Sequence, residues 1–309
     1  MKTILVAGGS GFIGKALIER LVSHYKVINV SRSLKKKSSL PNIVQWCEWT
    51  DNQQLVDAVK QADIIVNLAG ETINAVRWTK QKKERILHSR IQATETLVNL
   101  AIKYNPECRL INASAIGVYG NKKNNTKKFE AVYTEKSDIS VNTTDFLAEV
   151  GRAWEQPLDQ AVNHGLKIVK LRFGVVLSAK GGMLSQLLLP YKLGLGGIIG
   201  SGKQMLSWIA LEDLLGITLA IIKTESFLGA INLVAPDVVT QEQFSKTLAS
   251  VLHRPAFFHM PALFIRTLFG EMGDTLLLSG QTVASKRLDE LPYRLKYPHL
   301  RQALEAIFK

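Results

Sequence analysis

The chain has 309 residues, 46% of them hydrophobic, and no apolar run approaches the roughly 20 residues of a membrane-spanning helix. Its two cysteines, Cys47 and Cys108, lack metal-site spacing and are too few for a disulfide framework, so we expect reduced thiols, a cytoplasmic location and no membrane partner. A net charge of +13 raises the question of nucleic acid, but no aromatic residues interleave the lysine clusters; we expect a solvated basic surface and no nucleic-acid partner, with charge-driven binding as an alternative.

The first predicted unit is a strand over residues 4–7, a glycine turn and an amphipathic helix over 12–22. The glycines of the turn stand three residues apart. Glycine lets backbone approach a phosphate, and the free N–H groups in the first turn of a helix attract an anion. The turn therefore predicts a dinucleotide site, with an ordinary tight turn as the alternative. Its predicted cofactor residues are Gly8, Ser10, Gly11, Phe12, Ile13 and Gly14.

A second predicted strand over residues 26–32 ends where the adenosine ribose of a dinucleotide lies in such folds. Proteins that select NAD place Asp or Glu there to hold the 2′-hydroxyl, whereas this chain has Arg32 and Ser33. A guanidinium binds a 2′-phosphate through paired charged hydrogen bonds, and a carboxylate would repel it. We therefore predict NADP(H) as the cofactor. A surface arginine that merely ends a strand is the alternative.

Strands and helices continue to alternate up to residue 176. Further strands are predicted over 43–46, 109–114 and 165–172, and residues 63–70 are predicted to form a buried strand closed by a turn of small residues. Helices are predicted over 52–61, 85–104 and 146–161. This alternation predicts an α/β fold with a Rossmann-like, doubly wound parallel sheet. Such sheets present ligand contacts at the carboxyl ends of their strands. Small side chains at one such end suit a cofactor: Asn67, Leu68, Ala69 and Gly70.

The alternation stops beyond Val176. We expect residues 1–176 to form an NADP-binding domain and residues 177–309 a smaller, mostly helical lobe over the substrate, with a strand near 229–235 returning to the sheet. Residues 197–204 nearly match a P-loop, but Gln204 stands where Ser or Thr must bind magnesium. We expect Lys203, Gln204 and Trp208 to face a polar or anionic small molecule, unless the stretch is an ordinary surface loop. The six scattered histidines predict no metal site.

These ordered motifs resemble the extended short-chain dehydrogenases/reductases, and more narrowly the atypical "epimerase family protein" branch with its small C-terminal domain of unknown function. The matching stretches cover nearly the whole chain and include the glycine turn, residues 67–70, 114–120, 172–176, 207–209 and 232–236. The resemblance implies NADP(H), an oxidoreductase or sugar-nucleotide-epimerase-like activity on an unidentified small molecule, and a possible homodimer. It adds four cofactor residues: Ala113, Arg172, Gly174 and Val175.

Extended members of that superfamily use a Tyr-x-x-x-Lys pair, in which tyrosine exchanges a proton with the substrate and lysine lowers its pKa. In the corresponding window this chain has Phe146 and Val150, and neither can move a proton. Ser114 and Tyr119 are then the catalytic candidates, with a capping role for the serine and a packing role for the tyrosine as alternatives. The remaining candidates from this end of the sheet are Glu71, Tyr133, Glu135 and Asp145, of which Glu71, Tyr133 and Asp145 are expected in the substrate cleft.

Two functions therefore stay open. The first is an NADP(H)-dependent enzyme with an unusual proton donor. The second is a non-catalytic NADP(H)-binding sensor or regulator, since some members of the branch carry a cell-division-inhibitor label.

Overall fold

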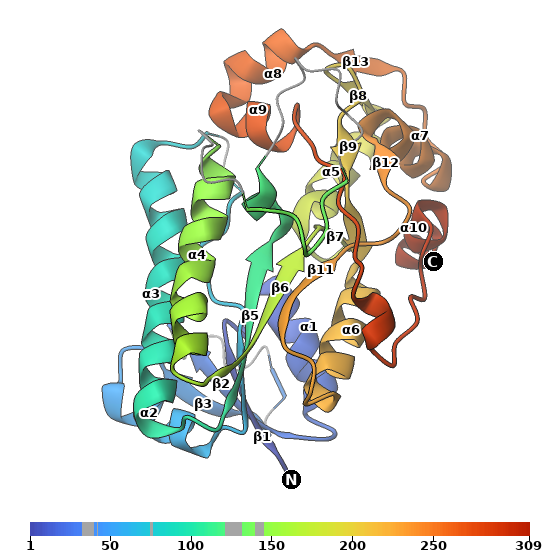
Figure 1. Cartoon of the computed structure of the whole chain (residues 1–309). Coiled ribbons are helices and arrows are strands. Elements are labelled where there is room, and N and C mark those ends of the chain that lie inside the picture. The colour runs from blue at the N-terminus through green and yellow to red at the C-terminus, as the bar shows by residue number, and fades with distance from the viewer. Residues whose placement is uncertain (33–39, 42, 75–76, 121–131, 140–144) are drawn as a thin grey trace.

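A seven-stranded parallel sheet forms the centre of the computed structural model, which describes residues 1–32, 40–41, 43–74, 77–120, 132–139 and 145–309 (Figure 1). The strand order is β11-β6-β5-β4-β1-β2-β3. The strands are β1 (Thr3–Ala7), β2 (Lys26–Ser31), β3 (Gln45–Glu48), β4 (Ile64–Asn67), β5 (Arg109–Ala115), β6 (Lys167–Phe173) and β11 (Gly229–Leu233). This topology confirms the predicted Rossmann-like fold.

Helices cover both faces of the sheet, as Figure 1 shows. They are α1 (Phe12–Leu21), α2 (Asn52–Gln61), α3 (Lys80–Tyr104), α4 (Phe146–Asn163) and α6 (Leu211–Lys223). Alternate residues of β1 point to opposite faces. Ile4 packs in a core with side chains of α1 and α6, and Leu5 packs in a second core with side chains of α2, α3 and α4. Burial of each such side chain contributes about 1.5–3 kcal/mol.

The direction of winding reverses between β1 and β4. From β1 the chain proceeds to β2 and β3 on one side, and from β4 to β5 and β6 on the other. The loops that leave neighbouring strands in opposite directions separate at this point, so a crevice forms outside the carboxyl ends. The glycine turn and the segment 67–70 follow these two strands directly.

The rest of the chain joins several helices to three short two-stranded pairs, which the sequence pattern did not indicate. The pairs are β7 (Val175–Leu177) with β10 (Trp208–Ala210), β8 (Gly197–Ile199) with β13 (Phe258–Met260), and β9 (Met205–Leu206) with β12 (Val239–Thr240). The helices are α5 (Gly182–Lys192), α7 (Gln241–Val251), α8 (Ala262–Phe269), α9 (Glu271–Leu276) and α10 (Leu300–Phe308), and the 3-10 turns are η2 (Ile116–Tyr119) and η3 (Leu288–Glu290).

Both cysteines are buried free thiols, and burial raises the pKa of each to about 11. Among the described residues, no helix combines the length and apolarity needed to span a membrane. The same part of the chain holds no group of three metal-ligating side chains.

Candidate functional site

The turn after β1 can be built only from glycine at two of its positions. Gly8 has φ +83°, and a side-chain carbon there would lie 2.8 Å from the carbonyl carbon of Leu68. A side-chain carbon at Gly14 would collide with the carbonyl oxygen of Gly8. The turn therefore holds its backbone against the loop that follows β4, and no methyl group fits between them.

The N-terminus of α1 opens from this turn without a side-chain cap. Gly11 is the N-cap residue, and no side-chain hydrogen bond caps it. The first N–H groups of the helix, from Phe12 and Ile13 onward, thus remain available to an anion. Behind the turn, the fully buried amide of Asn29 has no hydrogen-bond partner among the described residues, and a side-chain carbon at Gly9 would collide with it. An open backbone cradle at a helix N-terminus fits a dinucleotide diphosphate.

The segment after β4 is shaped by a buried amide network. Asn67 donates to Asn112 Oδ1 at 2.6 Å and to Thr94 Oγ1 at 3.1 Å, and its Oδ1 accepts the N–H of Ala69 at 3.1 Å. The side chain of Asn67 therefore holds the loop in place, and the backbone of Leu68 and Ala69 faces Gly8. Ala113, one residue beyond Asn112 on β5, is buried.

Arg32 lies at the carboxyl end of β2 with 82% of its side chain exposed. Its Nη1 is 4.0 Å from Oε2 of Glu71, whose Oε1 accepts a 2.8 Å hydrogen bond from Lys82. The Lys82 hydrogen bond is the main reason that the pKa of Glu71 lies below its usual value, although burial opposes it. Glu71 thus has a close basic partner of its own, and Arg32 extends into solvent. Ser33 lies outside the described residues.

Arg90 is a partly buried cation near the same loop. It donates to the carbonyl oxygens of Glu71 at 2.9 Å and Ile86 at 3.0 Å, and its guanidinium lies 4.9 Å from the ring of Trp154. Burial lowers its pKa to about 10. A side-chain carbon on Gly70 would lie 3.3 Å from this arginine. Arg90 therefore braces the backbone of residues 70–71.

A second polar cluster lies at the carboxyl ends of β5 and β6. Arg172 forms a two-pronged pair with Glu155 of α4, with both contacts at 2.8 Å. Ser114 donates to Glu155 at 2.7 Å, and Arg172 donates to the hydroxyl of Tyr119 at 2.8 Å. The tyrosine in turn donates to Oδ1 of Asn232 at 2.8 Å. All five side chains are buried. We call this set the buried polar chain.

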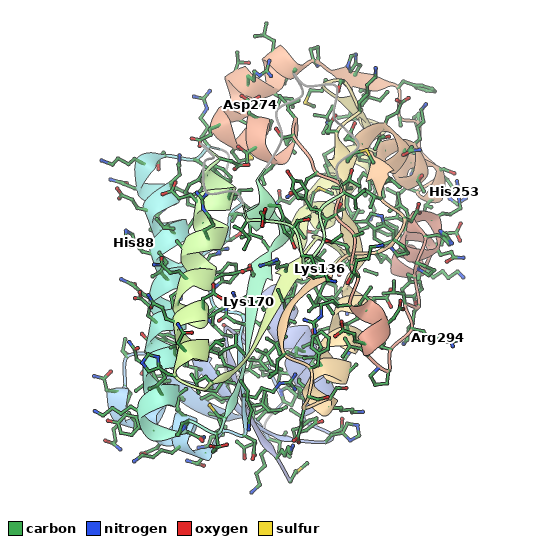
Figure 2. The ribbon with its side chains drawn as sticks, in the orientation of Figure 1. His88, Lys136, Lys170, His253, Asp274 and Arg294 are labelled. Carbon is green, nitrogen blue, oxygen red and sulfur yellow. The ribbon has the colours of Figure 1, made fainter. Side chains whose placement is uncertain are left out.

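Charge balance sets the ionisation of the buried polar chain. Burial opposes ionisation of Glu155, but Arg172, Lys170 and Ser114 together lower its pKa overall. Lys170 lies beside α4 (Figure 2), with its Nζ 3.4 Å from Glu155. Burial lowers the pKa of Arg172, but the hydrogen bonds and charge of Glu155 outweigh it and raise the value. Burial raises the pKa of Tyr119 and outweighs the opposing charge of Arg172, so the phenol stays protonated.

Two further candidates, Tyr133 and Glu135, contact Tyr119 and Asn232 respectively. The ring of Tyr133 stacks on that of Tyr119, with centroids 5.2 Å apart. Glu135 accepts hydrogen bonds from the backbone N–H of Asn232 and the hydroxyl of Ser285, each within 2.9 Å. The structure therefore brings Tyr133 and Glu135 together with the buried polar chain. Asp145 instead caps α4 by accepting the N–H of Leu147 at 2.9 Å.

The start of α4 is apolar. Phe146 and Val150 are buried in a cluster with Trp78, whose ring meets that of Phe146 edge-on at 5.1 Å. Nζ of Lys83 lies 4.6 Å from the centre of the Phe146 ring. These side chains pack the helix against its neighbours.

The predicted cleft position of Trp208 is wrong. Its side chain is fully buried in an apolar core, and its indole N–H donates to the carbonyl of Asp237. Gln204 is also turned inward, where it donates to the carbonyls of Ile199 and Leu277, while Lys203 is exposed. The inward orientation of Gln204 could not be predicted from the sequence, because one of its partners, Leu277, lies far along the chain.

Gly174 and Val175 connect the sheet to the C-terminal part. The N–H of Gly174 donates to the carbonyl of Leu233, and the N–H of Val175 to the carbonyl of Ser207. A side-chain carbon on Gly174 would lie 2.8 Å from that same carbonyl oxygen of Ser207. Their backbone thus sets how β10 lies against the sheet.

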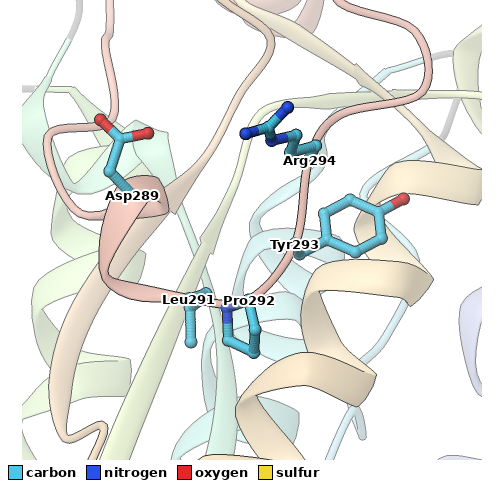
Figure 3. A pocket seen from close by; sticks show the side chains of 5 residues that line it. All are labelled: Asp289, Leu291, Pro292, Tyr293 and Arg294. Carbon is cyan, nitrogen blue, oxygen red and sulfur yellow. The ribbon is translucent and has the colours of Figure 1, made fainter.

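A hollow of about 410 Å³ lies on the C-terminal part (Figure 3). None of the predicted site residues lines it. The residues that line it are Asp289, Leu291, Pro292, Tyr293 and Arg294.

Two protein-family models match most of the chain. The model of the NAD-dependent epimerase/dehydratase family matches residues 4–233, and a domain of unknown function (DUF1731) matches residues 260–307. The chain belongs to the NAD-dependent epimerase/dehydratase family. The resemblance to the epimerase branch of the extended reductases is thereby confirmed.

Similar chains support this membership. An epimerase family protein of Staphylococcus saprophyticus is 40% identical over 309 residues and covers 99% of both chains. The human epimerase family protein SDR39U1, solved with NADPH, has a TM-score of 0.83 at 30% identity and covers 99% of this chain and 98% of its own. A UDP-glucuronic acid 4-epimerase of Bacillus cereus, at 19% identity and a TM-score of 0.78 with coverage of 99% and 98%, shares the fold.

Proposed function

We propose that this member of the epimerase/dehydratase family is an NADP(H)-dependent oxidoreductase or epimerase that acts on a sugar-nucleotide-like small molecule. The observation that carries the proposal is the glycine cradle at the start of α1 together with the exposed guanidinium of Arg32 at the end of β2. The cradle fits the diphosphate, and Arg32 fits a 2′-phosphate. Glu71 does not oppose this, because Lys82 is its closer partner.

Cofactor preference is the first test. In calorimetric titrations we expect NADPH to bind more tightly than NADH. Arg32→Gln should reduce NADPH affinity by roughly tenfold or more, because it removes a charge-assisted contact to phosphate, and should change NADH affinity far less. Lys26→Gln is the matched control, since this exposed lysine begins the same strand at its other end. Tighter NADH binding, or an unchanged preference in Arg32→Gln, would refute the choice of cofactor.

The chemistry needs a proton donor near the cofactor. When bound, the nicotinamide exchanges a hydride with the substrate. Tyr119 is held between Arg172 and Asn232, and its raised pKa keeps a proton on the phenol. Ser114 is the neighbouring hydroxyl, oriented by Glu155. We assign the proton-handling role to this pair.

A non-catalytic sensor is the second candidate. The observation that favours it is the burial of Ser114 and Tyr119, whose hydroxyls are both engaged within the protein, beside the apolar Phe146 and Val150. An oxidoreductase should consume NADPH when supplied with oxidised sugar nucleotides, whereas an epimerase should interconvert sugar-nucleotide epimers with no net consumption of NADPH. Ser114→Ala with Tyr119→Phe should abolish either turnover while retaining NADPH binding. Tight NADPH binding without turnover across a panel of such substrates would favour the sensor.

A further inference from the structure

One end of the molecule exposes large apolar side chains. Phe257 is 90% exposed, Leu263 72% and Leu193 64%, and Leu195, Phe258 and Phe264 are each at least half exposed. Isolated surface leucines are ordinary, but a cluster of this kind marks a contact surface. We call these six residues the apolar end; β8, β13 and α8, which carry or adjoin them, meet at the top of Figure 1.

The two segments that carry the apolar end lie side by side. β8 pairs with β13, and the N–H of Phe258 donates to the carbonyl of Gly196 at 3.3 Å. A side-chain carbon on Gly194 would lie 3.4 Å from Pro255. Leu193 and Leu195 flank that glycine, and Phe257 follows the proline by two residues. Residues 193–200 and 255–264 therefore form one continuous surface.

Neither of the two segments, 193–200 and 255–264, contains an acidic residue. The sequence contains no Asp or Glu between Asp159 and Glu212, nor between Glu242 and Glu271. Lys192 and Arg254, which adjoin the two segments, are exposed and form no ion pair with any residue that the structure describes. Arg266 on α8 pairs with Asp274 of α9, which Figure 2 labels.

We propose that the apolar end docks this protein onto an anionic lipid surface. Phenylalanine and leucine side chains enter the boundary between headgroups and acyl chains, and neighbouring lysine and arginine side chains contact the lipid phosphates. A second copy fits less well, because it would bring Lys192 and Arg254 of two chains, each with a net charge of +13, against one another. The inference departs from the expectation of no membrane partner and needs no spanning helix.

Vesicle flotation with the full-length chain tests the apolar contact. We expect binding to phosphatidylcholine vesicles that contain phosphatidylglycerol, and weak binding to phosphatidylcholine alone. Phe257→Ser with Leu263→Ser should lower the bound-to-free ratio roughly tenfold or more, because both side chains lose their apolar contact. Ile43→Ser is the matched control, since Ile43 is 76% exposed and lies outside the apolar end. All replaced side chains are exposed, so circular dichroism should show unchanged folding.

The charge contribution is tested by a second matched pair. Lys192→Gln with Arg254→Gln should reduce binding to anionic vesicles several-fold, and Lys60→Gln with Lys103→Gln, both exposed lysines on other helices, should reduce it much less. Three results would overturn the proposal: no binding to anionic vesicles, equal loss in test and control variants, or a dimer in sedimentation velocity that Phe257→Ser with Leu263→Ser dissociates. The last result would assign the apolar end to a second copy. The first result, no binding to anionic vesicles, is the one expected if the occupant is an acidic protein partner.

Discussion

At the scale of single residues, the buried ion pair of Glu155 and Arg172 holds the neighbouring hydroxyl groups of Ser114 and Tyr119 by hydrogen bonds. The carboxylate accepts from the guanidinium and from Ser114, and the guanidinium donates to Tyr119. A buried charge that loses its partner keeps its desolvation cost without compensation. Glu155 therefore positions Ser114 directly and Tyr119 through Arg172. Its carboxylate also compensates the buried charge of Arg172.

Glu155→Gln should thus lower the free energy of unfolding by about 3–5 kcal/mol, because it leaves Arg172 buried without a counter-charge. Urea unfolding followed by tryptophan fluorescence measures the change. Glu107→Gln is the matched control, since its contact with Lys167 at 3.4 Å is solvent-exposed and worth less than about 1 kcal/mol. Equal losses in the two variants would contradict the role given to Glu155.

At the scale of elements, α7 shows how local sequence fixes a helix boundary. The hydroxyl of Thr240 accepts the N–H of Gln243, and the side chain of Gln243 accepts the N–H of Thr240. This reciprocal capping satisfies two N–H groups that the helix leaves open. The helix begins at Gln241 for that reason, and it supports β8 through Ser245, which donates to the carbonyl of Gly197.

We expect Thr240→Ala to lower the free energy of unfolding by about 1 kcal/mol, since it removes the cap. Thr247→Ala, in the interior of the same helix, should change stability by no more than about 0.5 kcal/mol because alanine is the better helix former. Thermal and urea unfolding of both variants measure this difference. A larger loss in Thr247→Ala than in Thr240→Ala would show that the cap does not control the element.

At the scale of the whole molecule, shifted ionisation predicts how stability depends on pH. The pKa values of Glu71, Glu155 and Glu212 lie below their usual value in the folded state. Burial opposes this shift at Glu155 and Glu212 but is outweighed by the hydrogen bonds and charges of their basic partners, led by Arg172 and Arg20, and Lys82 is the main cause at Glu71. Unfolded glutamates bind protons near pH 4.3. Stability from these groups is therefore present above that pH and falls as the pH drops below it.

The buried thiols determine how stability depends on pH on the alkaline side, the alkaline limb of the stability curve, as the glutamates do on its acid limb. Cys47 and Cys108 have a pKa of about 11 when folded, whereas unfolded thiols ionise near pH 8.5. Stability should therefore fall between about pH 8.5 and 11 as the unfolded chain gains thiolates. Urea unfolding across this pH series tests both limbs. Cys47→Ala with Cys108→Ala should flatten the alkaline limb, and stability that rises below pH 4 would contradict the acid limb.

The sequence by itself determined the parts that depend on short-range pattern. The glycine spacing at 8–14, the apolar runs of the sheet strands and the alternation with amphipathic helices all act through neighbours in the chain, so the fold followed from them. The helix predicted over 52–61 has the observed boundaries Asn52–Gln61 for the same reason.

Only the tertiary structure decided where isolated polar and aromatic side chains lie. In the sequence, nothing distinguishes Glu155 from other polar residues on a helix. In the structure it lies beside Ser114 and Arg172 because α4 packs against β5 and β6. Trp208 looks like a cleft residue beside a glycine-rich stretch, yet the C-terminal helices bury it. Desolvation and ion pairing depend on which distant elements meet, and that information is absent from local spacing.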